Sequence, residues 1–210
     1  MLRGIAVFAA LALAGCSLSL PGLGPAPDLY DLSPKSTFPD EVPSASWQLV
    51  VEAPNAPTSI DTDRVAIKPG PLELKYFPTA KWTDRAPAMV QMLLIESFEN
   101  SGKIVAVGRR AIGLSGDYVL KSELREFQAE RFGPDGATTV RVRINLKLVR
   151  VTSGIIIASE SFERQATAAS DTPRDVVLAF DEALGGVLKR AVLWTLEAGN
   201  ADHAKNDEGF

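Results

Sequence analysis

Residues 118–151 read YVLKSELREFQAERFGPDGATTVRVRINLKLVRV. In the second half, apolar side chains alternate with polar and basic ones; the apolar set is Val140, Val142, Ile144, Leu146 and Leu148. Successive side chains of a strand point to opposite faces of a sheet, so this alternation predicts a strand over residues 138–151 with one buried face. Burying five such side chains contributes on the order of 10 kcal/mol before the entropy of ordering is subtracted. That contribution fixes which face of the strand is inside.

The first half of the same stretch predicts a second strand, over residues 118–131, joined to the first by a Gly-Pro-Asp-Gly hairpin turn at residues 133–136. Its apolar residues keep one phase of the alternation up to Leu124 and change to the opposite phase from Phe127. We predict a β-bulge at residues 125–126, because one extra residue there returns Phe127 to the core face.

Helical spacing of apolar residues predicts a helix over residues 84–101. Thr83 or Asp84 is expected to cap its first turn, and Gly102 to end it in a left-handed conformation. Shorter β-type segments predict further strands at residues 29–32, 47–53, 65–67, 72–77, 104–107 and 155–166.

A second helix is expected to begin at Thr172 as N-cap, with Pro173 as its first residue. Gly185 and Gly186 within it mark either a close approach to the sheet or an ordinary surface weakness. Residues 199–210 are polar and predict a disordered tail. The order strands, helix, strands, helix predicts an α+β fold: a largely antiparallel sheet with two helices packed on one face, as a single domain over residues 29–198.

The first 15 residues predict a secretory signal peptide. They contain one basic residue, Arg3, followed by about ten apolar residues, too few to span a bilayer. Residues 13–16, Leu-Ala-Gly-Cys, resemble the lipobox of bacterial lipoproteins. The resemblance implies cleavage after Gly15 and acyl chains on the thiol of Cys16; the alternative is an ordinary signal with a chance cysteine.

Cys16 is the only cysteine, so the chain forms no internal disulfide. Residues 16–28 are rich in proline and glycine and predict a tether between lipid and domain. Ser17 follows the cysteine, where an aspartate would favour the inner membrane in enterobacterial lipoproteins. We therefore expect the periplasmic face of the outer membrane.

The composition disfavours nucleic-acid binding and catalysis. The formal net charge is −4, whereas nucleic-acid binders are usually basic. The only histidine, His203, lies in the expected tail, and the only cysteine is assigned to lipid, so no histidine-based catalytic or metal group can be assembled. Asp61 and Asp63 flank the start of a strand and are interpreted as turn residues. We expect no enzyme activity and no cofactor beyond the covalent lipid.

A row of basic residues follows the strand 138–151, and it has two interpretations. It could contact anionic headgroups or a partner, or it could be a solvated face paired with carboxylates of the neighbouring strand, which we favour. The basic residues are Arg141, Arg143, Lys147 and Arg150, and the carboxylates are Glu123, Glu126 and Glu130.

Six short motifs, taken in order, resemble the ABC-type transport auxiliary lipoprotein family, which includes the outer-membrane lipoprotein of the paraquat-inducible MCE transport system. They are LYDL at 29–32, IDTDRV at 60–65, YFPTAKWTD at 76–84, DYVL at 117–120, EF at 126–127 and AFDEAL at 179–184. The resemblance implies a non-enzymatic subunit of an ABC transporter, with an MCE-domain partner, a permease and an ATPase, that moves phospholipid or another hydrophobic cargo.

Three functions follow as hypotheses. The chain docks a lipid-transport machine at the outer membrane, it carries lipid inside its own domain, or it is an envelope hydrolase. The absence of a histidine outside the expected tail disfavours the hydrolase. A continuous apolar cavity would favour the carrier and a solid core the docking subunit. Assembly into a homo-oligomer is left open.

Overall fold

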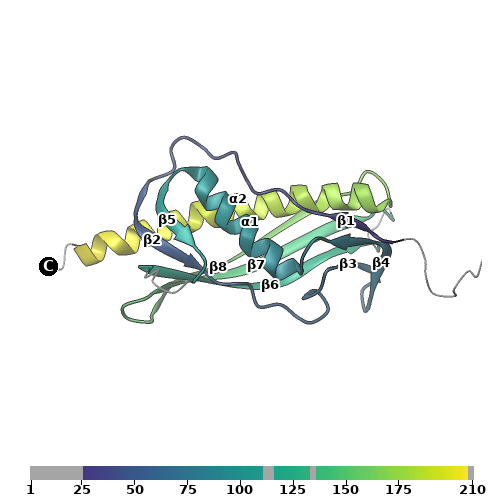
Figure 1. Cartoon of the computed structure of the whole chain (residues 1–210), viewed down its shortest axis with the longest axis horizontal. Helices are drawn as coiled ribbons and strands as arrows, with labels where there is room; N and C mark the ends of the chain where they lie inside the picture. The colour runs from purple at the N-terminus through teal and green to yellow at the C-terminus, as the bar shows by residue number, and fades with distance from the viewer. Residues whose placement is uncertain (1–25, 111–115, 133–135, 208–210) are drawn as a thin grey trace, which may run out of the picture.

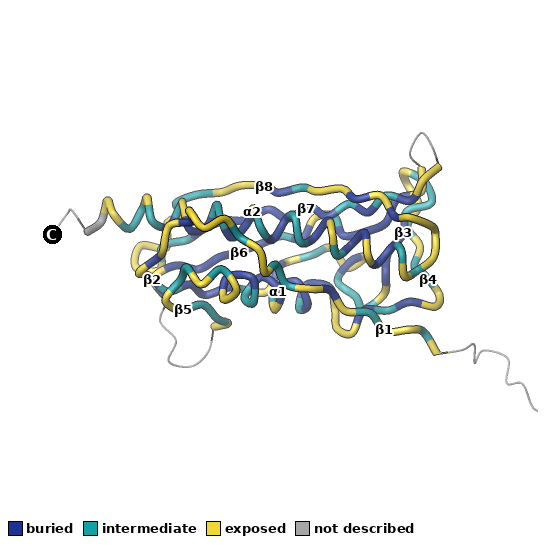
Figure 2. Tube along the Cα trace, turned by 90° about the horizontal axis from the view of Figure 1, so that it is seen from above, coloured by how far each residue is buried: buried dark blue, intermediate teal, exposed yellow. Residues whose placement is uncertain are grey.

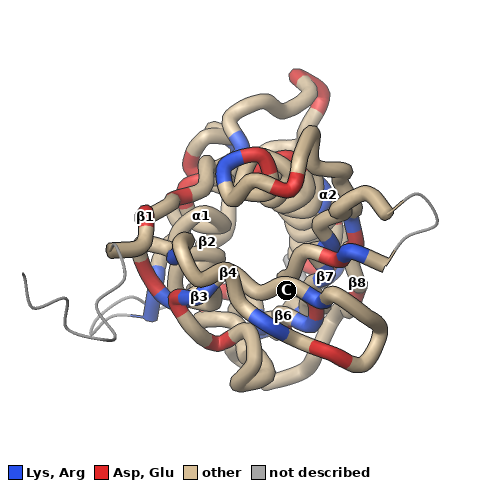
Figure 3. The backbone as a smooth tube through the Cα atoms, turned by 90° about the vertical axis from the view of Figure 1, so that its right-hand side faces the viewer, with Lys and Arg blue, Asp and Glu red and all other residues tan. Residues whose placement is uncertain are grey.

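The computed structural model describes residues 26–110, 116–132 and 136–207. In this part of the chain, eight strands form one sheet, and two helices lie on the same side of it and contact each other (Figure 1). Seen from one end, the strands curve beneath the helices (Figure 3). The elements are β1 Asp28–Tyr30, β2 Ala45–Val51, β3 Arg64–Gly70, β4 Glu73–Trp82, α1 Ala86–Ser101, β5 Ile104–Gly108, β6 Tyr118–Glu130, β7 Thr139–Arg150, β8 Ile156–Thr167 and α2 Pro173–Asp207. The predicted α+β fold with two helices is confirmed.

Strand β6 organises the sheet. One of its edges pairs with β7 along the whole strand, from Tyr118 opposite Arg150 to Glu130 opposite Thr139. Its other edge pairs first with β2 and then with β3, both in parallel. The sheet is therefore mixed. The long β6–β7 and β7–β8 pairs and the β3–β4 hairpin are antiparallel, while the short β1–β4 and β2–β5 pairs are parallel.

The predicted β-bulge is confirmed. Leu124 pairs with Ile144 and Glu126 with Arg143, so that Arg125 is the extra residue. Leu124 and Phe127 are consequently both buried on the core face, although an odd number of steps separates them. The extra residue reverses the phase of the alternation, as the sequence pattern requires.

The core fills the space between the sheet and the helices, with long buried stretches along β6, β7 and α2 (Figure 2). Its centre is a cluster of three rings: Trp82 of β4, Phe127 of β6 and Phe180 of α2. Their centroids are 5.7 Å apart for Trp82–Phe127, 5.1 Å for Trp82–Phe180 and 4.9 Å for Phe127–Phe180. These spacings lie in the range of favourable aromatic pairs. The cluster joins β4 and β6 to α2.

The start of α1 differs from the prediction. The N-cap is Arg85, without a side-chain capping bond, rather than Thr83 or Asp84. Asp84 instead accepts a hydrogen bond from the N–H of Arg85, and the N–H of Ala86 donates to the carbonyl of Thr62. A loop from another part of the chain thus satisfies the helix terminus that a local cap was expected to satisfy. The predicted end is confirmed, because Gly102 has a left-handed φ of 61°.

The start of α2 is as predicted, since the Thr172 hydroxyl accepts a hydrogen bond of 3.3 Å from the N–H of Asp175. Gly185 and Gly186 were expected to mark either a close approach to the sheet or an ordinary surface weakness, and each interpretation holds for one of the two residues. A Cβ on Gly186 would lie 3.2 Å from the Arg164 side chain of β8, whereas one on Gly185 would meet open space.

The prediction of a disordered tail from residue 199 is wrong for residues 199–207, which continue α2. Contacts with distant strands hold these turns: the Trp47 indole donates a 2.8 Å hydrogen bond to Asn200, and the Tyr118 hydroxyl donates one of 2.9 Å to Asp202. The Arg150 guanidinium also pairs with Asp202. None of these partners is local in sequence, so the polar composition of the segment gave no sign of them. In the described residues, we find no helix with the length and apolar character needed to cross a bilayer.

Candidate functional site

The predicted lipidation site lies outside the described residues. Cys16 and the cleavage position Gly15 precede the first described residue, and both remain predictions. The described chain starts beside β1, which pairs with the end of β4, while α2 ends at the opposite end of the long axis (Figure 1).

Asp61 and Asp63, interpreted from the sequence as turn residues, are both engaged in ion pairs. Arg85 lies 2.6 Å from Asp61, and the Lys81 ammonium lies 2.9 Å from Asp63. The hydrogen bond from Lys81 holds the pKa of Asp63 below its ordinary value. Asp63 ties the loop before β3 to the end of β4, and Asp61 ties it to the N-cap of α1, which supports the structural interpretation.

The described residues contain no group of three or more histidine, cysteine, aspartate or glutamate side chains placed to hold a metal ion. His203 lies in the last turns of α2.

Carboxylates neutralise the basic residues on the outer face of the sheet, which agrees with the favoured interpretation of a solvated face with paired charges. Arg141 contacts Glu130 at 3.1 Å and Glu163 at 2.6 Å. Arg143 contacts Glu126 at 2.8 Å. Burial alone would raise the pKa of Glu126, but the hydrogen bond from Gln128 and the charges of Lys68 and Arg143 outweigh it and lower the pKa. A ladder of paired charges is a poor site for anionic headgroups.

The other two basic residues are also paired. Lys147 contacts Glu123 at 3.2 Å, as the neighbouring-strand interpretation requires. Arg150, however, pairs with Asp202 of α2 rather than with a glutamate of β6. Arg150 shares the phase of the buried residues of β7 and therefore lies on the helix side of the sheet, where the unforeseen extension of α2 brings a carboxylate over the end of β7.

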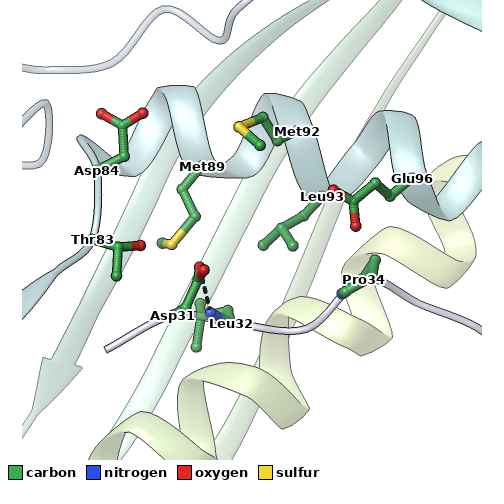
Figure 4. Close-up of a pocket in the computed structure, with 9 residues that line it drawn as sticks. All are labelled: Asp31, Leu32, Pro34, Thr83, Asp84, Met89, Met92, Leu93 and Glu96. Carbon is green, nitrogen blue, oxygen red and sulfur yellow. Dashed lines mark hydrogen bonds between the residues drawn. The ribbon is translucent and has the colours of Figure 1, made fainter. Parts of the chain in front are cut away.

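A pocket of about 440 Å³ lies between α1 and the segment that follows β1 (Figure 4). The pairing of β1 with the end of β4 positions that segment, because the N–H of Thr83 donates a 2.9 Å hydrogen bond to the carbonyl of Tyr30. The chain then leaves β4 directly into α1, so both walls are fixed by one strand pair. The lining residues are Asp31, Leu32, Pro34, Thr83, Asp84, Met89, Met92, Leu93 and Glu96.

The floor of this pocket, hereafter the α1 pocket, is apolar. Leu32, Met89 and Leu93 are buried, and Met92 is 42% exposed at its edge. Residues 89, 92, 93 and 96 recur at helical spacing, which places them on one face of α1 (Figure 4). Methionine side chains are flexible and polarizable, so such a floor adapts to different apolar shapes.

The rim of the α1 pocket is acidic. Its charged residues are Asp31, Asp84 and Glu96, and no lysine or arginine is among the nine lining residues. Asp31 accepts a 3.0 Å hydrogen bond from the N–H of Leu32, and Asp84 one of 2.6 Å from the N–H of Arg85. These bonds orient both carboxylates without neutralising them. The nine lining residues include no histidine and no cysteine.

Comparison with known proteins agrees with the family suggested by the sequence motifs. Residues 30–192 match the family described as ABC-type transport auxiliary lipoprotein component. The chain belongs to this family. The matched range covers both walls of the α1 pocket and all eight strands except the first residues of β1.

Two solved structures resemble this auxiliary lipoprotein. Protein XCC0632 from Xanthomonas campestris is 30% identical, with a TM-score of 0.80, and the match covers 84% of this chain and 99% of that one. A second, uncharacterized protein shares the fold at 15% identity and a TM-score of 0.55, covering 85% of this chain and 98% of that one.

A relative in Bradyrhizobium diazoefficiens, the uncharacterized protein bll6063, is 29% identical over 187 residues. The match covers 89% of the auxiliary lipoprotein, which spans 50% of the length of this curated relative.

Sequence reasoning missed the α1 pocket, although four of its residues lie within two of the family motifs. Asp31 and Leu32 belong to LYDL, and Thr83 and Asp84 belong to YFPTAKWTD. The parallel pairing of β1 with β4 brings these motifs together, and no local sequence pattern predicts that pairing. The available signal was the continuation of both motifs beyond the ends of their strands, where these four residues lie.

Proposed function

We propose that this auxiliary lipoprotein is a non-catalytic docking subunit that secures the periplasmic end of an ABC/MCE-type lipid-transport system at the outer membrane. Acyl chains on Cys16 hold it to the periplasmic face of that membrane. Its partners are the MCE-domain protein and, through it, the permease and ATPase. Membership of the family supports the link to an ABC-type transport system.

The observation that favours docking over carriage is the filled interior. The space between sheet and helices is occupied by large buried side chains, among them Trp47, Trp82, Phe98, Phe127 and Phe180. The α1 pocket lies at the surface, and about 440 Å³ is a volume for a side chain or a small ligand rather than for a lipid with two long acyl chains. A docking subunit needs a rigid body with a binding surface, which this structure provides.

The anchor is tested by metabolic labelling with palmitate in the native bacterium, followed by separation of inner and outer membranes. The wild-type chain is expected to carry label and to fractionate with the outer membrane. Cys16→Ser is expected to lose both, whereas the matched control Ser17→Ala keeps the label. Unlabelled wild-type protein, or a mature N-terminus other than Cys16, would refute the anchor.

The docking function is tested by binding. Full-length lipoprotein in dodecyl maltoside is titrated with the purified periplasmic region of the MCE-domain protein of the same transport system. A saturable complex is expected. Phospholipid recovered in stoichiometric amount from the lipoprotein alone, without such a complex, would favour the carrier instead.

A further inference from the structure

We propose that the α1 pocket receives a segment of the partner protein in which a lysine or arginine is flanked by apolar side chains. The proposal rests on the docking function above and assigns it a place on the surface. It is carried by two properties that coincide in this pocket, an apolar floor and an acidic rim without cations.

The rim selects the charge of the occupant. Asp31, Asp84 and Glu96 are the charged residues among those that line the pocket, and the basic residues that flank Thr83 and Asp84 are engaged elsewhere, Lys81 of β4 with Asp63 and Arg85 with Asp61. Within the described part of the chain, the side chain of Glu96 makes no hydrogen bond or ion pair. A cation that enters the pocket gains these attractions, whereas the phosphate of a phospholipid is repelled.

The floor selects the shape of the occupant. Lysine and arginine carry apolar stems that pack along hydrophobic surface while their charged ends stay at the rim. Met89 and Leu93 offer such a surface inside the pocket, and the exposed Met92 extends it outward along α1. A single basic side chain with an apolar neighbour fills about this volume, which is why we assign a protein segment rather than a whole lipid.

The tether of the lipoprotein itself does not match the pocket. Residues 16–28 contain no lysine or arginine, so they cannot complement the rim. A second copy of the chain is the remaining competitor, and the experiment separates it from the partner.

The test compares two charge reversals on the same helix. Glu96→Lys reverses a rim charge, and Glu99→Lys makes the same change at an exposed position of α1 outside the pocket. Full-length lipoprotein in dodecyl maltoside is titrated with the periplasmic region of the MCE-domain protein at 50 mM and 500 mM NaCl. We expect Glu96→Lys to weaken binding by about tenfold or more at low salt, and Glu99→Lys by less than about twofold.

A third variant tests the floor. Met92→Ala removes an exposed side chain that the fold does not need, and it is expected to weaken binding by about three- to tenfold at either salt concentration. Circular dichroism and thermal unfolding of all three variants should equal the wild type.

The outcomes separate the two proposals. Wild-type binding that none of the pocket variants alters would overturn the pocket proposal and leave the docking function standing. No binding by the wild type would overturn both. A change in sedimentation coefficient of the lipoprotein alone in Glu96→Lys, with partner binding intact, would assign the pocket to a second copy and would also overturn the proposal.

Discussion

Gly199 of α2 lies against the indole ring of Trp47 so closely that a Cβ built on the glycine would be 2.2 Å from Cζ2 of the ring. Trp47 cannot move aside, because it is buried and its Nε1–H donates a hydrogen bond to Asn200. A helix residue without a side chain is therefore what lets α2 lie directly on the start of β2. The glycine has a packing role that its unfavourable helix propensity would not suggest.

The first prediction compares two glycines of the same helix. Gly199→Ala is expected to lower the free energy of unfolding by about 1–3 kcal/mol through overpacking. Gly185→Ala, where a Cβ meets open space, is expected to raise it by about 1 kcal/mol. Urea denaturation followed by circular dichroism measures both, and shifts of the same sign would contradict the role given to Gly199.

The second prediction concerns acid stability. The hydrogen bond from Arg150, aided by that from Tyr118, holds the pKa of Asp202 below its ordinary value of 3.8, while burial opposes this shift. A carboxylate whose pKa is lower in the folded than in the unfolded protein stabilises the fold at pH values above the unfolded-state pKa. This stabilisation is lost as the pH falls through the folded-state pKa. Burial first, and then Asp202, raise the pKa of the Tyr118 hydroxyl, which stays protonated throughout this range.

Asp202→Asn is accordingly expected to cost about 1–2 kcal/mol at pH 7, and the difference from wild type should shrink as pH falls below about 4. The matched control is Asp63→Asn, whose partner Lys81 is more exposed; it should cost less than about 1 kcal/mol. Urea denaturation at pH 7, 5 and 3 provides the comparison. A pH-independent difference for Asp202→Asn would argue against this assignment.

The third prediction concerns the end of α2. A chain that ends at Ala198 lacks Gly199, Asn200 and Asp202, and it should unfold at a melting temperature several degrees lower than the full chain. A chain that ends at Asp207 keeps every contact described above and should match the wild type. Equal melting temperatures for the two truncations would restore the disordered-tail interpretation.

The fourth prediction concerns the bulge in β6. Deleting Arg125 removes the extra residue and leaves Leu124 and Phe127 two positions apart on one face of a regular strand, so we expect the fold to persist with a change of less than about 2 kcal/mol. Deleting Lys121, in the regular part of β6, reverses the phase of the apolar residues on one side of it and should cost about 3–5 kcal/mol or prevent folding. Arg125→Ala keeps the residue count and removes only an exposed ion pair with Glu123, so it should change stability by less than about 1 kcal/mol. Differential scanning calorimetry compares the variants, and a deletion of Arg125 that destabilises the protein as much as the deletion of Lys121 would refute the bulge.

Features that depend on local alternation were predictable from the sequence. The hairpin strands, the bulge and the neutralised basic row all follow from which residues share a phase in residues 118–151, and each is present. The end of α1 at Gly102 and the start of α2 at Thr172 were also predictable from the local sequence, because each depends on one residue with a strong conformational preference.

Features that depend on distant neighbours were not predictable. The parallel pairs of β6 with β2 and β3 join segments with no common pattern. The last turns of α2 are stabilised by Trp47 and Tyr118, more than eighty residues earlier in the chain. The α1 pocket and the capping of α1 by Thr62 are likewise tertiary in origin, and a single sequence carries no direct signal for them.

The position of β6 ties the stability of every part of the sheet to one strand. Because β7 covers one of its edges while β2 and β3 divide the other, neither half of the sheet can open without breaking hydrogen bonds of β6. Local opening is therefore suppressed in favour of global unfolding, and the amides of β6 should be the slowest in the chain to exchange with deuterium. Mechanical load applied between tether and partner would accordingly be borne by a single cooperative unit, not by two sub-sheets that yield in turn.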